Sequence, residues 1–167
     1  MTEAATFSRQ SFVHIALPTG NGWAARPMVP DDARYVHECY VKNYTDAKRR
    51  TLDMPRQCFD EGVEAIWRRL LRDALGIVAV SAEDPDLIVS WILYEPGNRA
   101  VHYMHTRERL QKMGVGQRML LWATQGWTNF AYTHQTPAWG KFRDALGLPC
   151  HYDPYRAMFN AEEMRGL

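Results

Sequence analysis

The sequence predicts a mixed α+β fold, with one central and mostly antiparallel sheet of about six or seven strands flanked by about four helices. Three observations predict it. β-Branched, apolar runs follow one another at residues 77–82, 87–95 and 100–106, with turn residues between them, which is typical of an antiparallel meander. Two segments with helical periodicity precede these runs. A glycine-containing turn and a third helical segment then lead into another strand, which is the order of a βαβ unit.

The first helical segment follows a short extended piece that ends at Pro30. We expect Asp31 or Asp32 to cap this helix, because a carboxylate accepts hydrogen bonds from the unpaired amides of a first turn. One face of the helix is apolar, and it carries Tyr35, Val36, Cys39 and Tyr40. Residues 1–20 are expected to be loose, apart from a strand at 11–17.

The second helical segment spans residues 58–76, and we expect Gly76 to end it. Its apolar stripe is made by Val63, Ile66, Trp67, Leu70, Leu71 and Leu75. After the meander, a helix is predicted from about Gly114, followed by a strand at 130–135 and a helix at 138–146. A final strand or strand pair is expected within 149–159. No linker or repeat interrupts the chain, so residues 1–167 are predicted to form a single domain.

Composition excludes several classes of protein. Hydrophobic residues make up 46% of the 167 residues, but no apolar run is long enough to cross a membrane. The first ten residues, MTEAATFSRQ, lack the pattern of a secretory signal, so we expect a cytoplasmic protein with no membrane partner. Cys39, Cys58 and Cys150 are far apart and odd in number, which favours reduced thiols over a disulfide framework and predicts no metal site.

The net charge of +1 shows that the protein as a whole does not attract nucleic acid, so any bound anion must be held locally. The chain has 6 Trp and 8 Tyr residues. A packed aromatic core explains them, and an aromatic-lined groove is the alternative.

Residues 107–118, RERLQKMGVGQR, are the best candidate for such a local site. A helix that begins after Gly114 presents unpaired amides and the positive end of its dipole. Gly114 and Gly116 lack a side chain, so an anion such as phosphate can approach the backbone closely. The alternative is an ordinary strand-to-helix turn with a solvated basic face. Neither a GxxxxGK nor a GxGxxG pattern is present.

The six residues QKMGVG, Gln111 to Gly116, match the pattern (Gln/Arg)-x-x-Gly-x-(Gly/Ala). This segment resembles the acyl-CoA pyrophosphate loop of the GNAT superfamily of N-acetyltransferases. The predicted order of elements across residues 24–160 is also similar to that family, and FRDALGL at 142–148 resembles its late helix. The stretch ILYEPGNRAVHYMH resembles GNAT-like proteins encoded by bacteriophages.

The resemblance implies that acetyl-CoA is the cosubstrate and that no metal is needed. The pyrophosphate would lie on the amides of the loop, which are those of Lys112, Met113, Gly114, Val115, Gly116 and Gln117. Lys112, Arg109 or Arg118 would reach the ribose phosphate. The pantetheine arm would pair with residues 102–106, where the sheet splays. There the amide of Met104 would polarise the thioester carbonyl, and Thr106 would add contacts.

In this chemistry a neutral amine attacks the thioester carbonyl, so a base or a water relay must first remove a proton. The candidates are Glu95, His102, His105 and His134. Strand alternation places His102, Met104 and Thr106 on one face, and Tyr103 and His105 on the other. Which face meets the acceptor stays open.

One departure from the family pattern concerns the leaving thiolate. Many relatives carry a tyrosine acid in the late helix, but Arg143 stands at that position here. Arginine is a poor proton donor, although its charge can stabilise a thiolate. Otherwise the thiolate leaves unaided, or another residue supplies the proton, namely Tyr132, Tyr152 or Tyr155.

Three functions remain open from the sequence. The first is acyl transfer, most simply of acetyl, from acyl-CoA to an amine on a small molecule or a protein, by a monomer or a homodimer. The second is a CoA-binding module with weak or no activity. The third is a nucleic-acid-modifying acyltransferase that uses AKRR at 47–50 and WRRLLR at 67–72. Residues 31–75 and the C-terminal strands are expected to shape the acceptor site. Its acidic candidates, which a solvated helix face also explains, are Asp46, Asp53, Asp60, Glu61 and Glu64.

Overall fold

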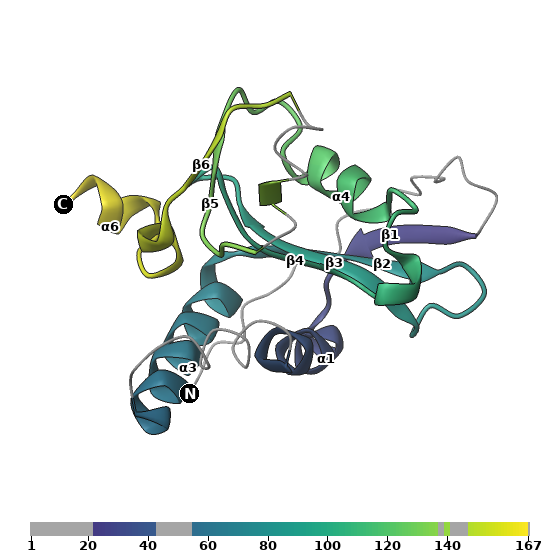
Figure 1. The fold of residues 1–167 in the computed structure, drawn as a ribbon, viewed down its shortest axis with the longest axis horizontal. Helices are drawn as coiled ribbons and strands as arrows, with labels where there is room; N and C mark the ends of the chain where they lie inside the picture. The colour runs from purple at the N-terminus through teal and green to yellow at the C-terminus, as the bar shows by residue number, and fades with distance from the viewer. Residues whose placement is uncertain (1–21, 43–54, 137–138, 141–146, 167) are drawn as a thin grey trace, which may run out of the picture.

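The structure is a computed structural model that describes residues 22–42, 55–136, 139–140 and 147–166. Its sheet runs in the order β1-β2-β3-β4-β5-β6 (Figure 1). The first three pairings are antiparallel and the last two are parallel. The strands are β1 (Trp23–Pro27), β2 (Leu75–Ser81), β3 (Ile88–Glu95), β4 (Ala100–Thr106), β5 (Phe130–Tyr132) and β6 (Cys150–Tyr152). The predicted mixed α+β class with a mostly antiparallel sheet is therefore confirmed.

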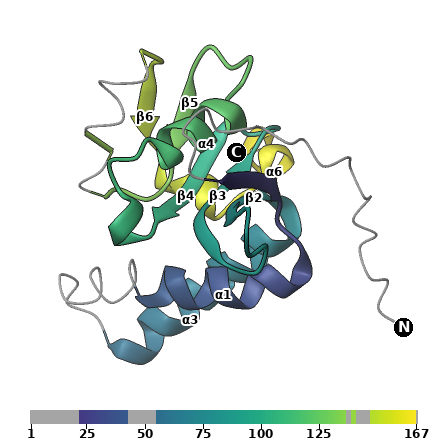
Figure 2. The same cartoon turned by 90° about the vertical axis from the view of Figure 1, so that its right-hand side faces the viewer.

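Helices cover both faces of the sheet. The described α-helices are α1 (Pro30–Tyr40), α3 (Arg56–Asp73), α4 (Val115–Ala123) and α6 (Ala161–Arg165). Helices α1 and α3 lie on one face and α4 lies on the other (Figures 1 and 2). Each face has its own apolar core: Trp91 and Tyr103 belong to the core under α1 and α3, and Ile92 and Val101 to the core under α4. Burial of both faces explains why β3 is apolar along nearly its whole length.

Asp32 takes part in the cap of the first helix, but as its third residue and by accepting the amide of the N-cap residue Val29 instead of an amide of the first turn. Asp32 accepts the amide of Val29 at 2.8 Å and also receives both Arg26 Nη atoms, at 2.6 and 2.9 Å. Asp32 is only 7% exposed, so this bidentate pair is held in a fixed geometry. The cap thus joins the end of β1 to the start of α1.

The predicted end of the second helix is wrong. Helix α3 ends at Asp73, and Gly76 lies inside β2, opposite Leu93. Leu75 is also in the strand, and Leu71 is 38% exposed, so neither belongs to the apolar stripe of the helix. The carbonyl of Gly76 accepts the Met28 amide at 2.9 Å, and a Cβ at this glycine would lie 2.7 Å from Met28 Cβ. Glycine is needed here for close approach of two chain segments, not as a helix end.

Strand β4 contains one extra residue. Leu93 pairs with Tyr103, whereas Tyr94 pairs with Val101, so His102 has no partner in the register and forms a β-bulge. Val101 packs in the core under α4, and Tyr103 packs in the core under α1 and α3.

The bulge overturns the simple alternation expected for β4. The His102 side chain contacts Glu95, which is bonded to Arg69 of α3. His102 therefore lies on the α1/α3 face with Tyr103. It does not share a face with Met104, which packs against the core under α4.

The C-terminal part differs in detail from the sequence prediction. β5 has three residues and is shorter than the predicted 130–135, and the final strand is the single β6. The 3-10 helix η3 (Pro154–Ala157) and the short α6 follow, and the sequence analysis anticipated neither. The predicted strand at 11–17 and most of the predicted helix at 138–146 lie outside the described residues.

We predict that Gly76→Ala lowers the free energy of unfolding by about 1–3 kcal/mol, because the new methyl group overpacks against Met28. The matched control is Gly62→Ala in α3, where a Cβ meets nothing within 4 Å. That change should raise stability by up to about 1 kcal/mol through helix propensity. Urea unfolding measures both, and effects of the same sign would contradict the close-approach explanation.

Candidate functional site

The turn that follows β4 has an unusual backbone. A single 3-10 turn, η2 (Glu108–Leu110), leads to Lys112 with φ 73° and Gly114 with φ 77°, both left-handed. Gly114 is the N-cap of α4. Gly116 packs tightly, because a Cβ there would lie 3.0 Å from Thr106 Oγ1. The two glycines thus have different roles: Gly114 allows the left-handed turn, and Gly116 lets α4 approach β4 closely.

The start of α4 presents unpaired backbone donors. No side chain in the part of the chain that the structure describes caps the helix, and the Arg118 amide makes the first intrahelical bond, to the Gly114 carbonyl at 3.1 Å. The amides of Val115, Gly116 and Gln117 therefore precede the helical ladder. Their dipoles add to that of the helix, which makes this end attractive to an anion.

Two contacts hold the turn together. The side-chain amide of Gln111 donates to the Thr106 carbonyl at 3.2 Å, which connects the turn to the end of β4. The Met113 amide donates to the Leu110 carbonyl at 3.4 Å, so this amide has a partner within the turn. The position of the α4 N-terminus relative to β4 is thus fixed by local bonds.

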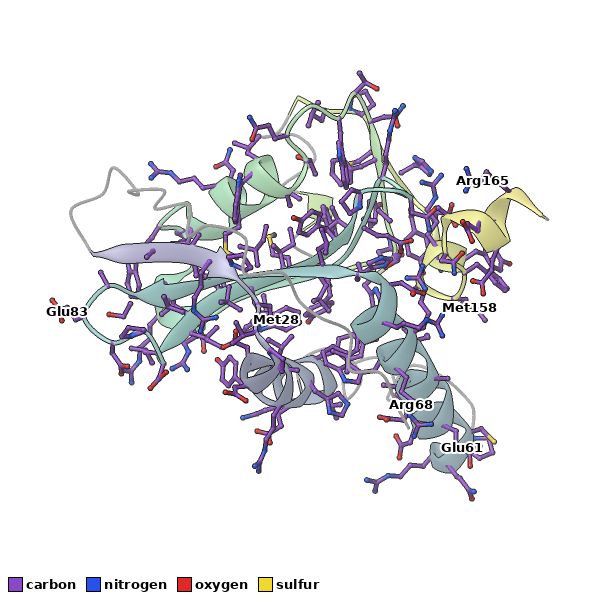
Figure 3. All side chains as sticks on the ribbon, turned by 180° about the vertical axis from the view of Figure 1, so that it is seen from behind. Met28, Glu61, Arg68, Glu83, Met158 and Arg165 are labelled. Atoms are coloured by element: carbon purple, nitrogen blue, oxygen red, sulfur yellow. The ribbon has the colours of Figure 1, made fainter. Side chains whose placement is uncertain are left out.

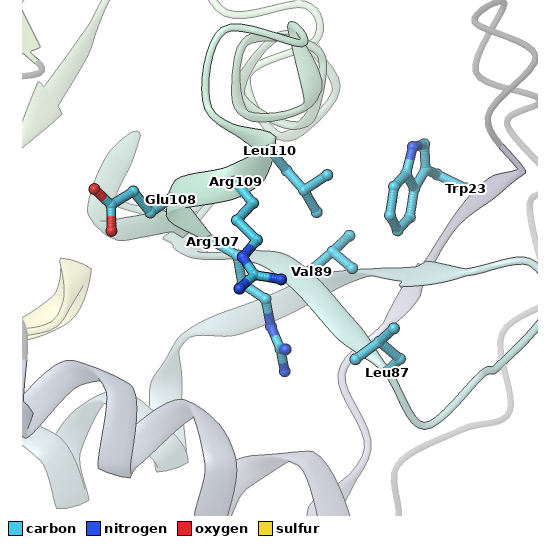
Figure 4. A pocket seen from close by; sticks show the side chains of 7 residues that line it. All are labelled: Trp23, Leu87, Val89, Arg107, Glu108, Arg109 and Leu110. Carbon is cyan, nitrogen blue, oxygen red and sulfur yellow. The ribbon is translucent and has the colours of Figure 1, made fainter.

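A pocket of about 420 Å³ lies beside this turn (Figure 4). Arg107 and Arg109 extend over it, whereas Glu108 points away. The Arg107 Nε atom donates to the Tyr35 hydroxyl at 3.1 Å. The remaining walls are apolar or aromatic and consist of Trp23, Leu87, Val89 and Leu110. An apolar recess with guanidinium groups at its rim suits a planar anionic group.

Next to the turn, β4 has an edge that pairs with no strand among the described residues. Its ladder with β5 ends at the pair Val101–Tyr132. The Arg107 amide donates to Val89 of β3 at 2.9 Å. By alternation the His105 amide also points to β3, and the amides of Met104 and Thr106 point to the unpaired edge. An extended ligand can therefore pair with β4 at this edge.

The other face of β4 carries the histidines. His102 is fully buried, and burial lowers its pKa, with Glu95 partly opposing the effect. His105 is half-buried beside Trp91, with ring centroids 6.1 Å apart. Burial and the Arg107 charge lower the pKa of His105. Both imidazoles are therefore neutral near neutral pH, as a proton acceptor must be.

Glu95 is held in a buried ion pair. Its Oε2 atom lies 2.6 Å from Arg69 Nη2 and 3.3 Å from His102 Nε2. Burial raises the pKa of the Glu95 carboxyl, but the bonds from His102 and Arg69 outweigh burial, so the net pKa is below its ordinary value. Glu95 therefore stays ionised and orients His102.

The predicted site residues fall into two groups. Met104, Thr106 and the segment Gln111–Gln117 come together where β4 ends and α4 begins. Glu95, His102 and His105 lie on the opposite face, and Arg143 lies outside the described residues. Of the alternative acids, Tyr132 and Tyr152 are neighbours with ring centroids 5.7 Å apart, and Tyr155 is 63% exposed.

Sequence reasoning missed two residues that contact the predicted ones. Arg69 was interpreted as part of a surface basic run, yet it is 6% exposed and bonds Glu95, a residue 26 positions away. Thr133 bonds both His102 and His134. No local spacing signals either contact, because both depend on the sheet bringing distant segments together.

Within residues 22–42, 55–136, 139–140 and 147–166, no cluster of three or more His, Cys, Asp or Glu side chains could hold a metal ion. None of the helices in these ranges has the length and apolar character needed to cross a membrane.

No known family model and no curated protein matches the chain. It is similar to the structure of a possible acetyltransferase from Clostridium difficile 630, at 13% identity and a TM-score of 0.40, over 86% of this chain and 87% of that one. It is also similar to a dodecameric spermidine N-acetyltransferase from Vibrio cholerae, at 16% identity and a TM-score of 0.36, over 61% and 62%.

We predict that stability falls as pH decreases through about 6.5, the ordinary pKa of histidine. A group with a lowered pKa in the folded state binds protons preferentially in the unfolded state, so acid favours unfolding. His102→Gln should flatten the stability profile between about pH 7 and about pH 5. The control is His151→Gln at an exposed position of β6. A slope that is unchanged in His102→Gln, measured by urea unfolding at each pH, would argue against the buried neutral imidazole.

Proposed function

We propose that the chain is an acyl-CoA-dependent N-acyltransferase that transfers an acyl group, with acetyl the expected one, to an amine. One juxtaposition carries the proposal. The uncapped N-terminus of α4, which suits a pyrophosphate, lies next to the unpaired edge of β4, which suits an extended amide-containing arm. Acyl-CoA has a pyrophosphate that is followed directly by an extended, amide-containing pantetheine arm. The QKMGVG pattern and its resemblance to the GNAT superfamily support the same assignment.

Different residues would bind different parts of acyl-CoA. The amides of Val115, Gly116 and Gln117 would bind the pyrophosphate, with the helix dipole supplying favourable charge. Lys112, Met113, Gly114 and Gln111 complete the predicted loop, and Thr106 would contact the pantetheine. Lys112, Arg118 or Arg109, which lies at the pocket rim, would reach the ribose phosphate. The Nη1 atom of Arg118 is buried without a hydrogen-bond partner among the described residues.

The chemistry would take place between the two faces of β4. The Met104 amide would donate to the thioester carbonyl and stabilise the negative charge that develops on its oxygen. Neutral His105 or His102, on the α1/α3 face, would accept the proton of the amine, directly or through water. Glu95 would act through His102, since Arg69 keeps it ionised. Either the thiolate leaves unaided, or Arg143 stabilises it.

The acceptor would approach from the α1/α3 face. Three of the acidic candidates lie on α3, and each is engaged on the helix surface: Asp60 with Arg56, Glu61 with Gln57 and Glu64 with Arg68. Glu61 and Arg68 project away from the sheet (Figure 3). These pairs favour the solvated-face interpretation over an amine-attracting patch.

The nucleic-acid alternative receives little support from the basic run WRRLLR. Arg68 pairs with Glu64, Arg72 with Asp73, and Arg69 is buried against Glu95. These charges are neutralised locally, whereas phosphate binding needs free cations. AKRR lies outside the described residues. Four ideas from the sequence stay predictions: an inactive CoA-binding module, a bacteriophage-type origin, a cytoplasmic location and a monomeric or dimeric state.

We predict that acetyl-CoA and CoA bind the wild-type protein, and that Gly114→Val weakens binding by at least about tenfold, or about 1.4 kcal/mol. The added side chain would occupy the place where the anion approaches the backbone. Calorimetric titration measures both, and dephospho-CoA tests the contribution of the ribose phosphate.

Gly126→Val is the matched control for this experiment. Gly126 has φ 79°, close to the 77° of Gly114, and a Cβ meets nothing within 4 Å at either glycine. The two substitutions should therefore destabilise the backbone by similar amounts, but Gly126 lies beyond the C-terminal end of α4, away from the candidate loop. Equal CoA affinity in the two variants would reject the loop assignment.

We predict that Met104→Pro folds but loses about 10²–10³-fold in kcat, because proline removes the amide at the unpaired edge and leaves the bonds between β4 and β3 in place. His105→Pro is the control for the direction of the amide. It removes an amide that points to β3, so this variant should be clearly less stable than Met104→Pro. Thermal unfolding and a thiol-release assay measure the two effects. An active Met104→Pro variant would exclude this amide as the carbonyl donor.

A further inference from the structure

The pocket beside η2 has positive charge at its rim that no described residue neutralises. Arg107 and Arg109 extend over it, and Glu108 points away from both (Figure 4). Within the part of the chain that the structure describes, no carboxylate forms an ion pair with either arginine. By contrast, an Nη atom of Arg26 lies 2.6 Å from a carboxylate oxygen of Asp32. The two cations at the pocket are therefore available to an anion from outside the chain.

Arg107 is held in place through both its backbone and its side chain. Its amide donates to the Val89 carbonyl at 2.9 Å, and its carbonyl accepts the Leu110 amide at 2.8 Å. Its Nε atom donates to the Tyr35 hydroxyl at 3.1 Å, and the guanidinium carbon lies 5.4 Å from the centre of the Tyr35 ring. The two Nη atoms have no hydrogen-bond partner among the described residues. A guanidinium that is already oriented loses little freedom when it binds an anion.

The interior of the pocket is apolar. Its walls are Trp23 of β1, Leu87 just before β3, Val89 of β3 and Leu110 of the turn, and Trp23 stands opposite the turn (Figure 4). The volume of about 420 Å³ suits a small molecule, and a small inorganic anion would leave most of it empty. A protonated amine would be repelled by two guanidinium groups. A flat apolar body with one anionic group therefore suits both the walls and the rim.

The pocket and the unpaired edge lie on opposite sides of β4. The sheet order places β1, β2 and β3 before β4, whereas the edge proposed for the pantetheine arm faces away from β3. The pocket takes its walls from β1, from β3 and from the turn. Strand β4 therefore separates a ligand in the pocket from a pantetheine arm bound as proposed. Arg109 is named for both sites, as one of three alternatives for the ribose phosphate.

We propose that the pocket beside η2 binds an aromatic carboxylate, at a site separate from that of acyl-CoA. The ring of the ligand lies against Trp23 and Leu110, and its carboxylate lies between the guanidinium groups of Arg107 and Arg109. Binding needs this pocket alone, so the inference goes beyond the proposed acyl transfer and does not depend on it.

The first test is calorimetric titration with 2-naphthoate, 2-naphthamide and acetate. The amide has the same ring without the charge, and acetate has the charge without the ring. We expect 2-naphthoate to bind and 2-naphthamide to bind at least about tenfold more weakly, because hydrogen bonds to charged groups are stronger than neutral ones. Acetate should show no binding at the same concentrations. No binding of 2-naphthoate, or equal affinity for either of the other two compounds, would overturn the proposal.

The second test locates the carboxylate. Arg109→Gln should weaken 2-naphthoate binding by about threefold or more, as expected for loss of a solvent-exposed charge interaction. Arg99→Gln is the matched control. It removes the same charge from an exposed arginine in the turn between β3 and β4, at the opposite end of these strands from the pocket. Equal losses in the two variants would point to net charge instead of a site, and would overturn the proposal.

The third test fills the pocket. Leu87 is 37% exposed, so the larger ring of Leu87→Trp can extend over the pocket without entering the core. We expect this variant to keep the wild-type Tm and to bind 2-naphthoate at least about tenfold more weakly. Leu121→Trp is the control, because Leu121 is 45% exposed on α4 and is not a wall of the pocket. Unchanged affinity in Leu87→Trp would overturn the proposal.

The last test titrates CoA into the protein saturated with 2-naphthoate. We expect the same CoA affinity as without 2-naphthoate, because separate sites without coupling bind independently. Displacement of 2-naphthoate by CoA would show that the two share one site and would overturn the proposal. Binding of 2-naphthoate by a wild-type protein that does not bind CoA would instead overturn the proposed function and leave this inference standing.

Discussion

The single extra residue in β4 is the constraint on which the arrangement of the site depends. Because His102 forms a bulge, Val101 and Tyr103 face opposite sides of the sheet, although residues two apart in a regular strand face the same side. This change directs the amides of Met104 and Thr106 away from β3, and it brings His102 to the side where Glu95 and Arg69 can bond it. Strict alternation counted back from Met104 would instead place His102 under α4, on the opposite face of the sheet from Glu95 and Arg69.

Much of the fold could be predicted because it is encoded in local patterns. The three strands of the meander, the helix after Gly114 and the apolar face of α1 follow from alternation, from turn chemistry and from helical spacing. The turn itself was also correctly located, since left-handed backbone at Gly114 and close packing at Gly116 both require glycine.

The remaining features depend on contacts between distant segments. Gly76 appears to be a helix end in sequence, but its role is set by Met28, which only the folded chain brings close. A bulge leaves no signature in a single sequence, so alternation assigned His102 to the wrong face. Arg69 and Glu95 both have the composition of surface residues, and nothing in their spacing indicates that they bury each other.

The short parallel ladder between β4 and β5 has a further consequence. Two residue pairs join β4, the last of the four antiparallel strands, to β5. The meander and the turn at Gly114 form one architectural unit, while the segment after α4 is attached at one end of the sheet. A change confined to β6 therefore leaves intact the two bonds that hold the turn at Gly114, because both are made within residues 106–113.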